Sequence, residues 1–185
     1  MRLLENEVEL VKELCERIKA EKEKIKPKTK IKILDIGCGT GKLAIYLREE
    51  TGCDVTGIDP GRESIEKARM NTSSVKVEFE VQPAEEMTFA NNTFDFVVSL
   101  KALHEMAKPV KALGESNRVL KEGGRIFIID WVGGVARTRS HAHAKKYFTR
   151  ESLEEVLSET GFTDIRIELN KEGELMLAEG EKIIA

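Results

Sequence analysis

The sequence predicts an α/β protein with a doubly wound parallel sheet whose last strand runs antiparallel to its neighbour. The first observation behind this fold is that short apolar runs alternate with amphipathic segments from residue 30 to residue 161. Such alternation is typical of parallel strands connected by helices that cover both faces of the sheet. The second observation is that only residues 170–173 separate the last two apolar runs, a connection short enough for a hairpin. Hairpin strands are antiparallel, so the strand direction reverses near the end of the chain.

Each element follows from its own pattern of apolar residues. Continuous or alternating apolar runs predict strands at residues 30–36, 54–58, 75–81, 94–100, 125–132, 163–169 and 174–179. Apolar residues at helical spacing predict helices at residues 42–50, 62–70, 110–120 and 150–160. Gly123 and Gly124 are expected to end the third of these helices, and Gly161 is expected to end the fourth.

The first 30 residues are predicted to form an appended helix and a basic linker. A single apolar stripe with a period of 3.6 residues is formed by Leu4, Val8, Val11, Cys15 and Ile18. Pro27 disfavours helix in the residue before it and therefore ends this segment. We expect residues 1–30 to be helix and linker and residues 31–185 to be one domain. The helix either packs on the flank of that domain or covers a ligand as a lid.

The composition excludes several classes of protein. The chain has 185 residues, 41% of them hydrophobic and 34% charged, and its net charge of −3 argues against nucleic-acid binding. No apolar run approaches the roughly 18 residues of a membrane span, and the N-terminus turns acidic too early for a signal peptide. Cys15, Cys38 and Cys53 form neither a secreted disulfide framework nor a pair with metal-ligand spacing. We expect a cytoplasmic protein with no metal and no membrane partner.

The strongest functional signal is the run LDIGCGTG at residues 34–41, between the first strand of the sheet and the helix after it. Gly37, Gly39 and Gly41 stand at alternate positions, which lets the backbone turn tightly and bring its N–H groups against a ligand. A dinucleotide fingerprint would need a glycine where Lys42 stands, so the loop disfavours a nicotinamide or flavin cofactor.

Asp59 is the second candidate for ligand binding. It ends the second strand and precedes Pro60 and Gly61. In doubly wound sheets an acid at this place accepts hydrogen bonds from ribose hydroxyls. The same carboxylate could instead cap the helix that begins near Arg62. The glycine loop precedes Asp59 with one helix and one strand between them, and this order favours the ribose role.

Further motifs occur in order along the chain: QPAEEMTF at residues 82–89, NTFDFVVS at 92–99, LHEM at 103–106 and RVLKEGG at 118–124. Together with DIGCGTG at residues 35–41, this series resembles the class I S-adenosylmethionine-dependent methyltransferases, in their small-molecule, type 11-like branch. The resemblance covers about residues 31–179, and its motifs are specific as a series rather than singly. It implies a Rossmann-like sheet of seven strands with helices on both faces.

The resemblance also implies S-adenosylmethionine as the cofactor and S-adenosylhomocysteine as the product. It places Asp35 near the methionine amino end, Asp59 on the ribose, and Ala84 and Glu85 at the adenine. Residues 82–83 are Gln-Pro where such proteins usually have Gly-Asp, so the adenine contact departs from the common pattern. The predicted cofactor-binding residues are Asp35, Gly37, Cys38, Gly39, Gly41, Asp59, Pro60, Ala84, Glu85 and Ser99.

His104 is the predicted catalytic residue. A sulfonium methyl donor needs no nucleophile on the protein, which mainly aligns the acceptor and excludes water. A hydroxyl or protonated-amine acceptor does need a base, and His104 follows the fourth strand at the edge where ligands bind. The alternative is that His104 only shapes the pocket wall. His141 and His143 have no third metal ligand nearby in sequence, and no metal site is predicted.

The segment between Trp131 and Arg150 contains basic residues and no acidic residue. At the ligand-binding edge it would attract an anionic acceptor, although a solvated loop explains it equally well. The predicted substrate-binding residues are Trp131, Arg137, Arg139 and Tyr147. Trp131 is either a wall of the pocket or the last core residue of its strand.

The predicted function is transfer of a methyl group from S-adenosylmethionine to a small molecule, which the basic segment suggests is anionic. Two alternatives are an RNA or protein methyltransferase and a non-catalytic, S-adenosylmethionine-binding regulatory protein. The net charge of −3 disfavours a nucleic-acid partner. We expect a monomer or a homodimer.

Overall fold

Seven strands form one sheet in the order β3-β2-β1-β4-β5-β7-β6 in the computed structural model, which describes residues 3–24, 30–72, 76–134 and 147–184. The strands are β1 (Lys32–Ile36), β2 (Asp54–Asp59), β3 (Glu78–Val81), β4 (Phe94–Leu100), β5 (Leu120–Trp131), β6 (Phe162–Leu169) and β7 (Leu175–Lys182). Neighbours from β3 to β5 pair in parallel, while β7 runs antiparallel to both β5 and β6. This arrangement confirms the predicted fold class, including the reversed last strand.

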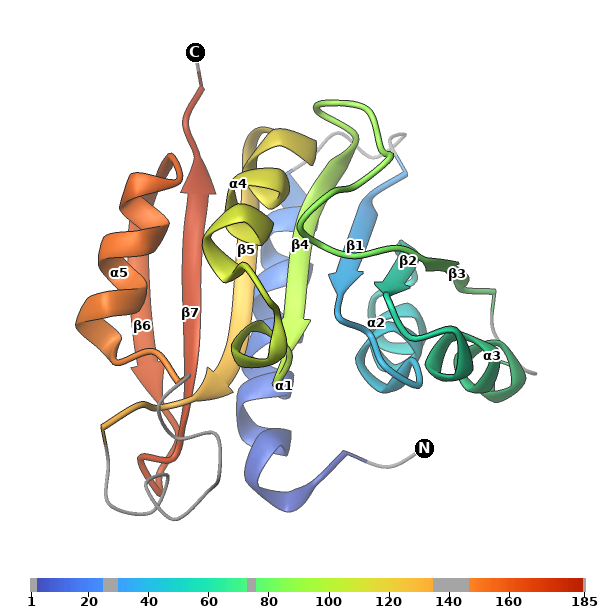
Figure 1. Ribbon diagram of the computed structural model, residues 1–185, viewed down its shortest axis with the longest axis horizontal. Coiled ribbons are helices and arrows are strands. Elements are labelled where there is room, and N and C mark those ends of the chain that lie inside the picture. The colour runs from blue at the N-terminus through green and yellow to red at the C-terminus, as the bar shows by residue number, and fades with distance from the viewer. Residues whose placement is uncertain (1–2, 25–29, 73–75, 135–146, 185) are drawn as a thin grey trace.

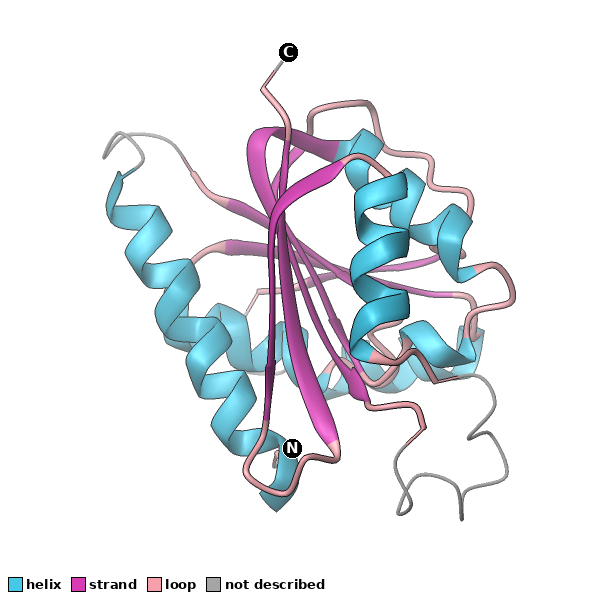
Figure 2. Ribbon diagram, turned by 90° about the vertical axis from the view of Figure 1, so that its left-hand side faces the viewer, coloured by secondary structure: helices cyan, strands magenta, loops and turns pink. Residues whose placement is uncertain are grey.

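Helices cover both faces of the sheet, as Figures 1 and 2 show. They are α1 (Glu5–Lys24), α2 (Lys42–Thr51), α3 (Arg62–Asn71), α4 (Pro109–Val119) and α5 (Arg150–Glu159), with a 3-10 turn, η1, at Leu103–Glu105. Phe127 and Ile129 of β5 join the core with α1 and α2, whereas Ile126 and Ile128 join the core with α4 and α5. The strand is buried on both faces, which explains its continuous apolar sequence.

α1 packs against the sheet through a stripe that differs from the predicted one at its start. The buried side chains of α1 are Glu7, Leu10, Val11, Leu14, Cys15 and Ile18. Leu4 is exposed and Val8 is only partly buried, while Glu7 is completely buried. A charged residue therefore takes the first inward position of α1, at the end of the helix that lies beside the arrowhead of β4 (Figure 1).

The two glycines expected to end α4 lie instead inside β5. The helix ends at Val119 and the strand begins at once, with Leu120 opposite Phe94. The next pair is Arg125 opposite Phe96, so five residues of β5 span only two residues of β4. This bulge accommodates Gly123, whose φ of 70° suits glycine. β3 is also shorter than predicted, because it begins at Glu78.

The topology indicates that ligands bind at the carboxyl edge of the sheet, where the parallel strands end. Loops from the carboxyl ends of β1 and β4 leave in opposite directions, because the strand order reverses between these two neighbours. Open α/β sheets bind ligands at such a switch point. In the described part of the chain, no helix is long and apolar enough to cross a membrane.

Candidate active site

The glycine loop after β1 is shaped by three residues with positive φ. Gly37, Gly39 and Gly41 have φ values of 68°, 53° and 83°. A Cβ at Gly37 would lie 2.5 Å from Cβ of Ala102, and one at Gly41 would lie 2.6 Å from the ring of Phe79. A Cβ at Gly39 would meet nothing within 4 Å. Gly37 and Gly41 are therefore needed for close packing, whereas Gly39 borders open space that a ligand can fill.

Asp59 ties this loop to the turn after β2. Its Oδ2 accepts a hydrogen bond from the N–H of Gly39 at 3.0 Å, and its Oδ1 accepts one from the N–H of Gly61 at 2.8 Å. The carboxylate therefore holds the backbone of the loops that follow β1 and β2. Each oxygen keeps a further lone pair, so two ribose hydroxyls can still donate to it. Gly61 is the N-cap residue of α3, so Asp59 holds the turn before the helix rather than capping the helix, and this contact leaves room for the ribose role.

Two adjoining clefts lie along this edge, and both are lined by Gly37 and Lys101. The first, here called the glycine-loop cleft, has a volume of about 270 Å³. Its other lining residues include Leu4, Glu7, Asp35, Cys38, Gly39 and Lys42. The second, here called the Asp59 cleft, has a volume of about 550 Å³. It is lined in addition by Asp59, Pro60, Ala84, Glu85, Ala102 and Met106.

Asp35 lies in the glycine-loop cleft as a buried carboxylate without a counter-ion. Its side chain shares the α1 and α2 face of β1 with Ile33, and only 1% of the residue is exposed. Neither oxygen makes a hydrogen bond of good geometry with a described residue. Burial raises the pKa of Asp35 to about 8, and the neighbouring charge of Asp59 adds to the rise. A cationic amine in this cleft would remove the cost of burying the charge, so the site fits the amino end of S-adenosylmethionine.

His104 and Asp130 form a buried pair beyond the two clefts. His104 lies in η1, and its Nδ1 is 2.6 Å from Oδ1 of Asp130 at the end of β5. The backbone N–H of His104 donates to the other oxygen of Asp130 at 3.1 Å, and the N–H of Trp131 donates to Oδ1 at 2.7 Å. The Nε2 atom lies 3.1 Å from Oε1 of Glu105. Asp130 is therefore held firmly by the backbone and fixes the orientation of the imidazole ring.

The charges around His104 favour its protonated form. Burial lowers the pKa of His104, but the hydrogen bond and charge of Asp130, with a contribution from Glu105, outweigh it and raise the pKa above its ordinary value. An imidazole of this kind is a stronger base than a free one, and it becomes available as the pH rises. The arrangement can thus accept a proton from a hydroxyl group that reaches Nε2.

Aromatic side chains surround the imidazole. The ring of Tyr147 meets that of His104 edge-on with centroids 4.8 Å apart, and the Trp131 ring lies 6.4 Å from Tyr147. Nζ of Lys101 lies 5.0 Å from the centroid of Trp131. The structure thus brings together Trp131 and Tyr147, two of the predicted substrate-binding residues. The other two, Arg137 and Arg139, lie outside the described residues.

Most of the predicted cofactor-binding residues gather in the two clefts. Those that line the clefts are Asp35, Gly37, Cys38, Gly39, Asp59, Pro60, Ala84 and Glu85. Gly41 lies behind the loop against Phe79 instead. Ser99 is completely buried on the opposite face of the sheet from Asp35, with Val97, and its Oγ has no partner in the described part of the chain. Neither Gly41 nor Ser99 lines a cleft.

Four further residues of this region have no role in the sequence prediction: Glu7, Lys42, Lys101 and Asp130. Asp130 carries a recognisable signal, because it is the acid that ends a strand of continuous apolar residues. Glu7 is a charged residue on the inward face of α1, and it would stand out in the sequence only if the rotation of the helix about its axis were known. The described residues contain no group of three His, Cys, Asp or Glu side chains able to hold a metal.

Comparisons with known proteins place the chain in a family. Residues 34–128 match the family described as a methyltransferase domain. The chain is 32% identical over 151 residues to the O-methyltransferase resE of Aspergillus sclerotiorum, covering 72% of this chain and 57% of that protein. It is 29% identical over 171 residues to an O-methyltransferase of Pyrenophora dematioidea, covering 85% of this chain and 64% of that protein. The chain therefore spans less than two thirds of the length of these two relatives.

A solved structure shares the fold. It is an S-adenosylmethionine-dependent methyltransferase from Methanosarcina mazei, which superposes with a TM-score of 0.71 at 23% identity and covers 84% of this chain and 94% of that one. The match of the family to more than half of the chain agrees with the glycine loop, the Asp59 contact and the reversed last strand. The chain belongs to the family of S-adenosylmethionine-dependent methyltransferases.

Proposed function

We propose that this chain transfers a methyl group from S-adenosylmethionine to a hydroxyl oxygen of a small molecule. The observation that carries the proposal is the position of the His104–Asp130 pair next to the Asp59 cleft, since Ala102 and Glu105, close to His104 in sequence, line that cleft. The two relatives described above are O-methyltransferases, which supports an oxygen acceptor. The net charge of −3 supports a small acceptor over RNA.

Different residues of the two clefts would bind different parts of the cofactor. Asp59 would accept hydrogen bonds from the ribose, with Pro60, Ala84 and Glu85 near the adenine, and Asp35 would pair with the ammonium group. When bound, S-adenosylmethionine supplies a methyl group on a positively charged sulfur, so its leaving group is already activated. The protein then has to align the acceptor, exclude water and remove one proton.

His104 would remove that proton. Because Asp130 accepts a hydrogen bond from Nδ1–H, the neutral imidazole carries its lone pair on Nε2. Nε2 can take the acceptor proton once Glu105 turns away, and Glu105 is free to do so because its side chain is 54% exposed. Asp130 then stabilises the imidazolium. Trp131 and Tyr147 would form the wall against which an acceptor lies.

The proposal is tested first by binding and then by turnover. Isothermal titration should show binding of S-adenosylmethionine and S-adenosylhomocysteine, and absence of both would overturn the proposal. Labelled S-adenosylmethionine should then transfer its methyl group to hydroxyl compounds in a metabolite extract. Label found only in RNA or protein would contradict a small acceptor, and binding without any transfer would indicate a regulatory role.

His104→Ala should lower kcat by about 10²- to 10⁴-fold with the affinity for S-adenosylhomocysteine unchanged, because general-base catalysis contributes about that much. In the wild type, kcat should rise with pH through a pKa above the ordinary value for histidine. Asp130→Asn removes the main influence that raises this pKa, so the rise should move to lower pH while kcat falls. An unchanged kcat in His104→Ala at every pH would mean that His104 only shapes the wall.

A further inference from the structure

Glu7 makes an unusual buried contact in the glycine-loop cleft. It is completely buried in the first turn of α1 and forms ion pairs with Lys42 and Lys101, the latter at 2.7 Å between Oε2 and Nζ. The N–H of Leu4 donates to Oε1 of Glu7 at 2.8 Å. Oε2 makes no hydrogen bond of good geometry in the described part of the chain, so its contact with Lys101 is an ion pair alone.

The lysines come from the two loops that frame the cleft. Lys42 is the first residue of α2, directly after the glycine loop, and Lys101 follows β4 with a φ of 52°, which is rare outside glycine. Such backbone strain is retained where the surrounding structure demands a particular position of the side chain. Lys101 borders both clefts, and Lys42 borders the glycine-loop cleft with Asp35.

The charges of this cleft match an amino-acid group. Asp35 is a buried acid without a cation, and Lys42 and Lys101 are cations that share one internal carboxylate. The methionine end of S-adenosylmethionine carries one ammonium and one carboxylate group, and each needs an opposite charge in a cleft that excludes water. Asp35 suits the ammonium. Among the described residues that line this cleft, the cations available to the carboxylate are Lys42 and Lys101, where Glu7 already lies.

We propose that Lys42 and Lys101 form the carboxylate-binding pair of the cofactor cleft, and that Glu7 of α1 occupies this pair in the absence of cofactor and competes with it. The proposal rests on the function proposed above and deepens it. Glu7 lies in the first turn of α1, after the exposed Leu4, so a small movement of that turn would release its carboxylate to water. Cofactor binding is thereby coupled to the position of the helix that closes the cleft.

The test compares two ligands that share the adenosine and the sulfur and differ in the amino-acid group. S-adenosylhomocysteine carries the amino-acid group, whereas 5′-methylthioadenosine has the same adenosine and lacks that group. Both are titrated calorimetrically into the wild type, Glu7→Gln, Lys42→Met and Lys101→Met. Glu9→Gln and Lys12→Met, on the exposed side of α1, make the same charge changes outside the cleft. Thermal unfolding of each variant shows whether it is folded.

Each lysine variant should bind S-adenosylhomocysteine about tenfold more weakly, as expected for one charged hydrogen bond. Glu7→Gln should bind it about tenfold more tightly, because the competing charge is gone. In all three variants the affinity for 5′-methylthioadenosine should stay within about twofold of the wild type, and both control variants should match the wild type with both ligands.

Several outcomes would overturn the proposal. Weaker binding of S-adenosylhomocysteine to Glu7→Gln would mean that Glu7 positions the lysines rather than competing with the ligand. Equal loss of both ligands in the lysine variants would place the lysines at the adenosine or in the loop scaffold. If Glu7→Gln does not fold, Glu7→Asp retains the charge on a shorter side chain and should still tighten binding of S-adenosylhomocysteine alone. A wild type that binds neither ligand would refute the proposed function itself, a result distinct from all of these.

Discussion

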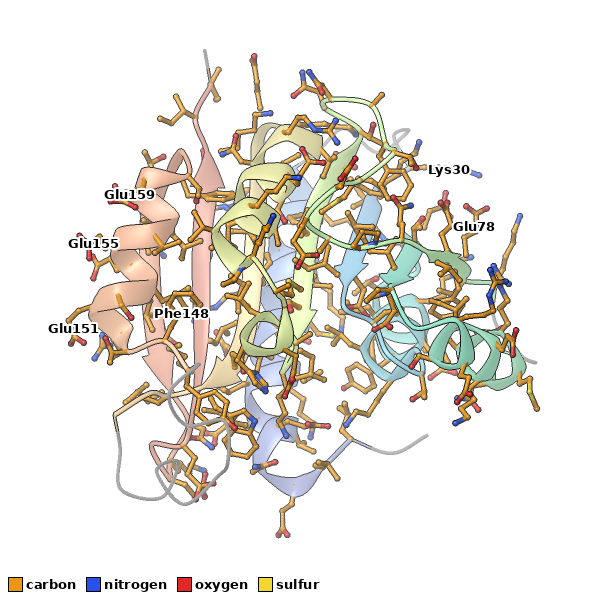
Figure 3. All side chains as sticks on the ribbon, in the orientation of Figure 1. Lys30, Glu78, Phe148, Glu151, Glu155 and Glu159 are labelled. Carbon is orange, nitrogen blue, oxygen red and sulfur yellow. The ribbon has the colours of Figure 1, made fainter. Side chains whose placement is uncertain are left out.

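The two edges of the sheet carry hollows of similar size, but the charged residues are exposed at one edge and buried at the other. The amino edge has a hollow of about 460 Å³, comparable to the 550 Å³ of the Asp59 cleft. Three of its charged residues form exposed ion pairs: Asp54 lies 3.2 Å from Arg48 and 4.0 Å from Lys30, whose side chain is 85% exposed. Figure 3 shows Lys30 and Glu78 at this edge. Exposed pairs of this kind contribute little free energy.

The carboxyl edge instead holds ionisable groups that are buried, and one of them has no counter-ion. Asp35 has no partner in the described part of the chain, and Glu7 is completely buried. His104 and Asp130 are nearly buried as well. Burying such groups costs free energy that the fold must offset elsewhere, so a ligand able to pair with them binds strongly. The binding edge therefore differs from the amino edge in the buried, unpaired carboxyl group of Asp35 and in its positive-φ glycines, not in the size of its hollow.

Asp35→Asn should have the largest effect, and it should act on stability in a pH-dependent way. The folded protein holds the Asp35 proton up to about pH 8, whereas the unfolded chain releases it near 3.8, so the wild type loses stability as the pH rises between these values. The slope approaches about 1.4 kcal/mol per pH unit. The variant lacks this loss, so its advantage in free energy of unfolding should grow from pH 4 to pH 8.

Denaturant unfolding of the ligand-free protein at pH 5 and pH 8 measures this difference. The same variant should bind S-adenosylhomocysteine more weakly, since the ammonium loses its counter-ion. A variant that is less stable than the wild type at pH 8 would contradict the idea that Asp35 is an uncompensated charge. Asp54→Asn, which changes an exposed carboxylate at the amino edge, is the matched control and should keep the wild-type dependence on pH.

Asp59→Ala should have the next largest effect, and it should act on binding. The change removes the acceptor of the Gly39 and Gly61 N–H groups and, in the proposed site, the partner of the ribose. We expect a loss of about 1.5–3 kcal/mol in the binding of S-adenosylhomocysteine, typical of hydrogen bonds to a charged group. Titration calorimetry checks this value. An unchanged affinity would show that Asp59 serves only the backbone of the two loops.

Asp54→Asn should have the smallest effect. It removes the surface pairs with Arg48 and Lys30, and we expect the free energy of unfolding to change by less than about 1 kcal/mol. Affinity for S-adenosylhomocysteine should equal that of the wild type. A clear loss of binding in this variant would break the contrast between the two edges, because it would give the amino edge a part in the site.

Local patterns were sufficient to predict the sheet and the cofactor loop. Alternating strands and helices predict a parallel sheet wherever they occur, and the hairpin around Asn170 reverses β7 through a short connection alone. Gly37 and Gly39 are recognisable because the positive φ they adopt belongs to one turn, and Asp59 is recognisable because it ends a strand directly before Pro60 and Gly61. The start of β5 was mispredicted, because glycines end helices as readily as they allow the bulge that holds Gly123 here.

The sequence by itself thus determined the fold class and the glycine loop, and it singled out Asp59 as a candidate for the ribose. The tertiary structure alone decided which charges meet. Asp130 reaches His104 across 26 residues and Glu7 reaches Lys42 across 35, because the fold brings all four residues to the carboxyl edge of the sheet. A helical period specifies a stripe but not how the helix is rotated against the sheet. Packing of Leu10, Leu14 and Ile18 sets that rotation, and it turns Glu7 rather than Val8 into the cleft.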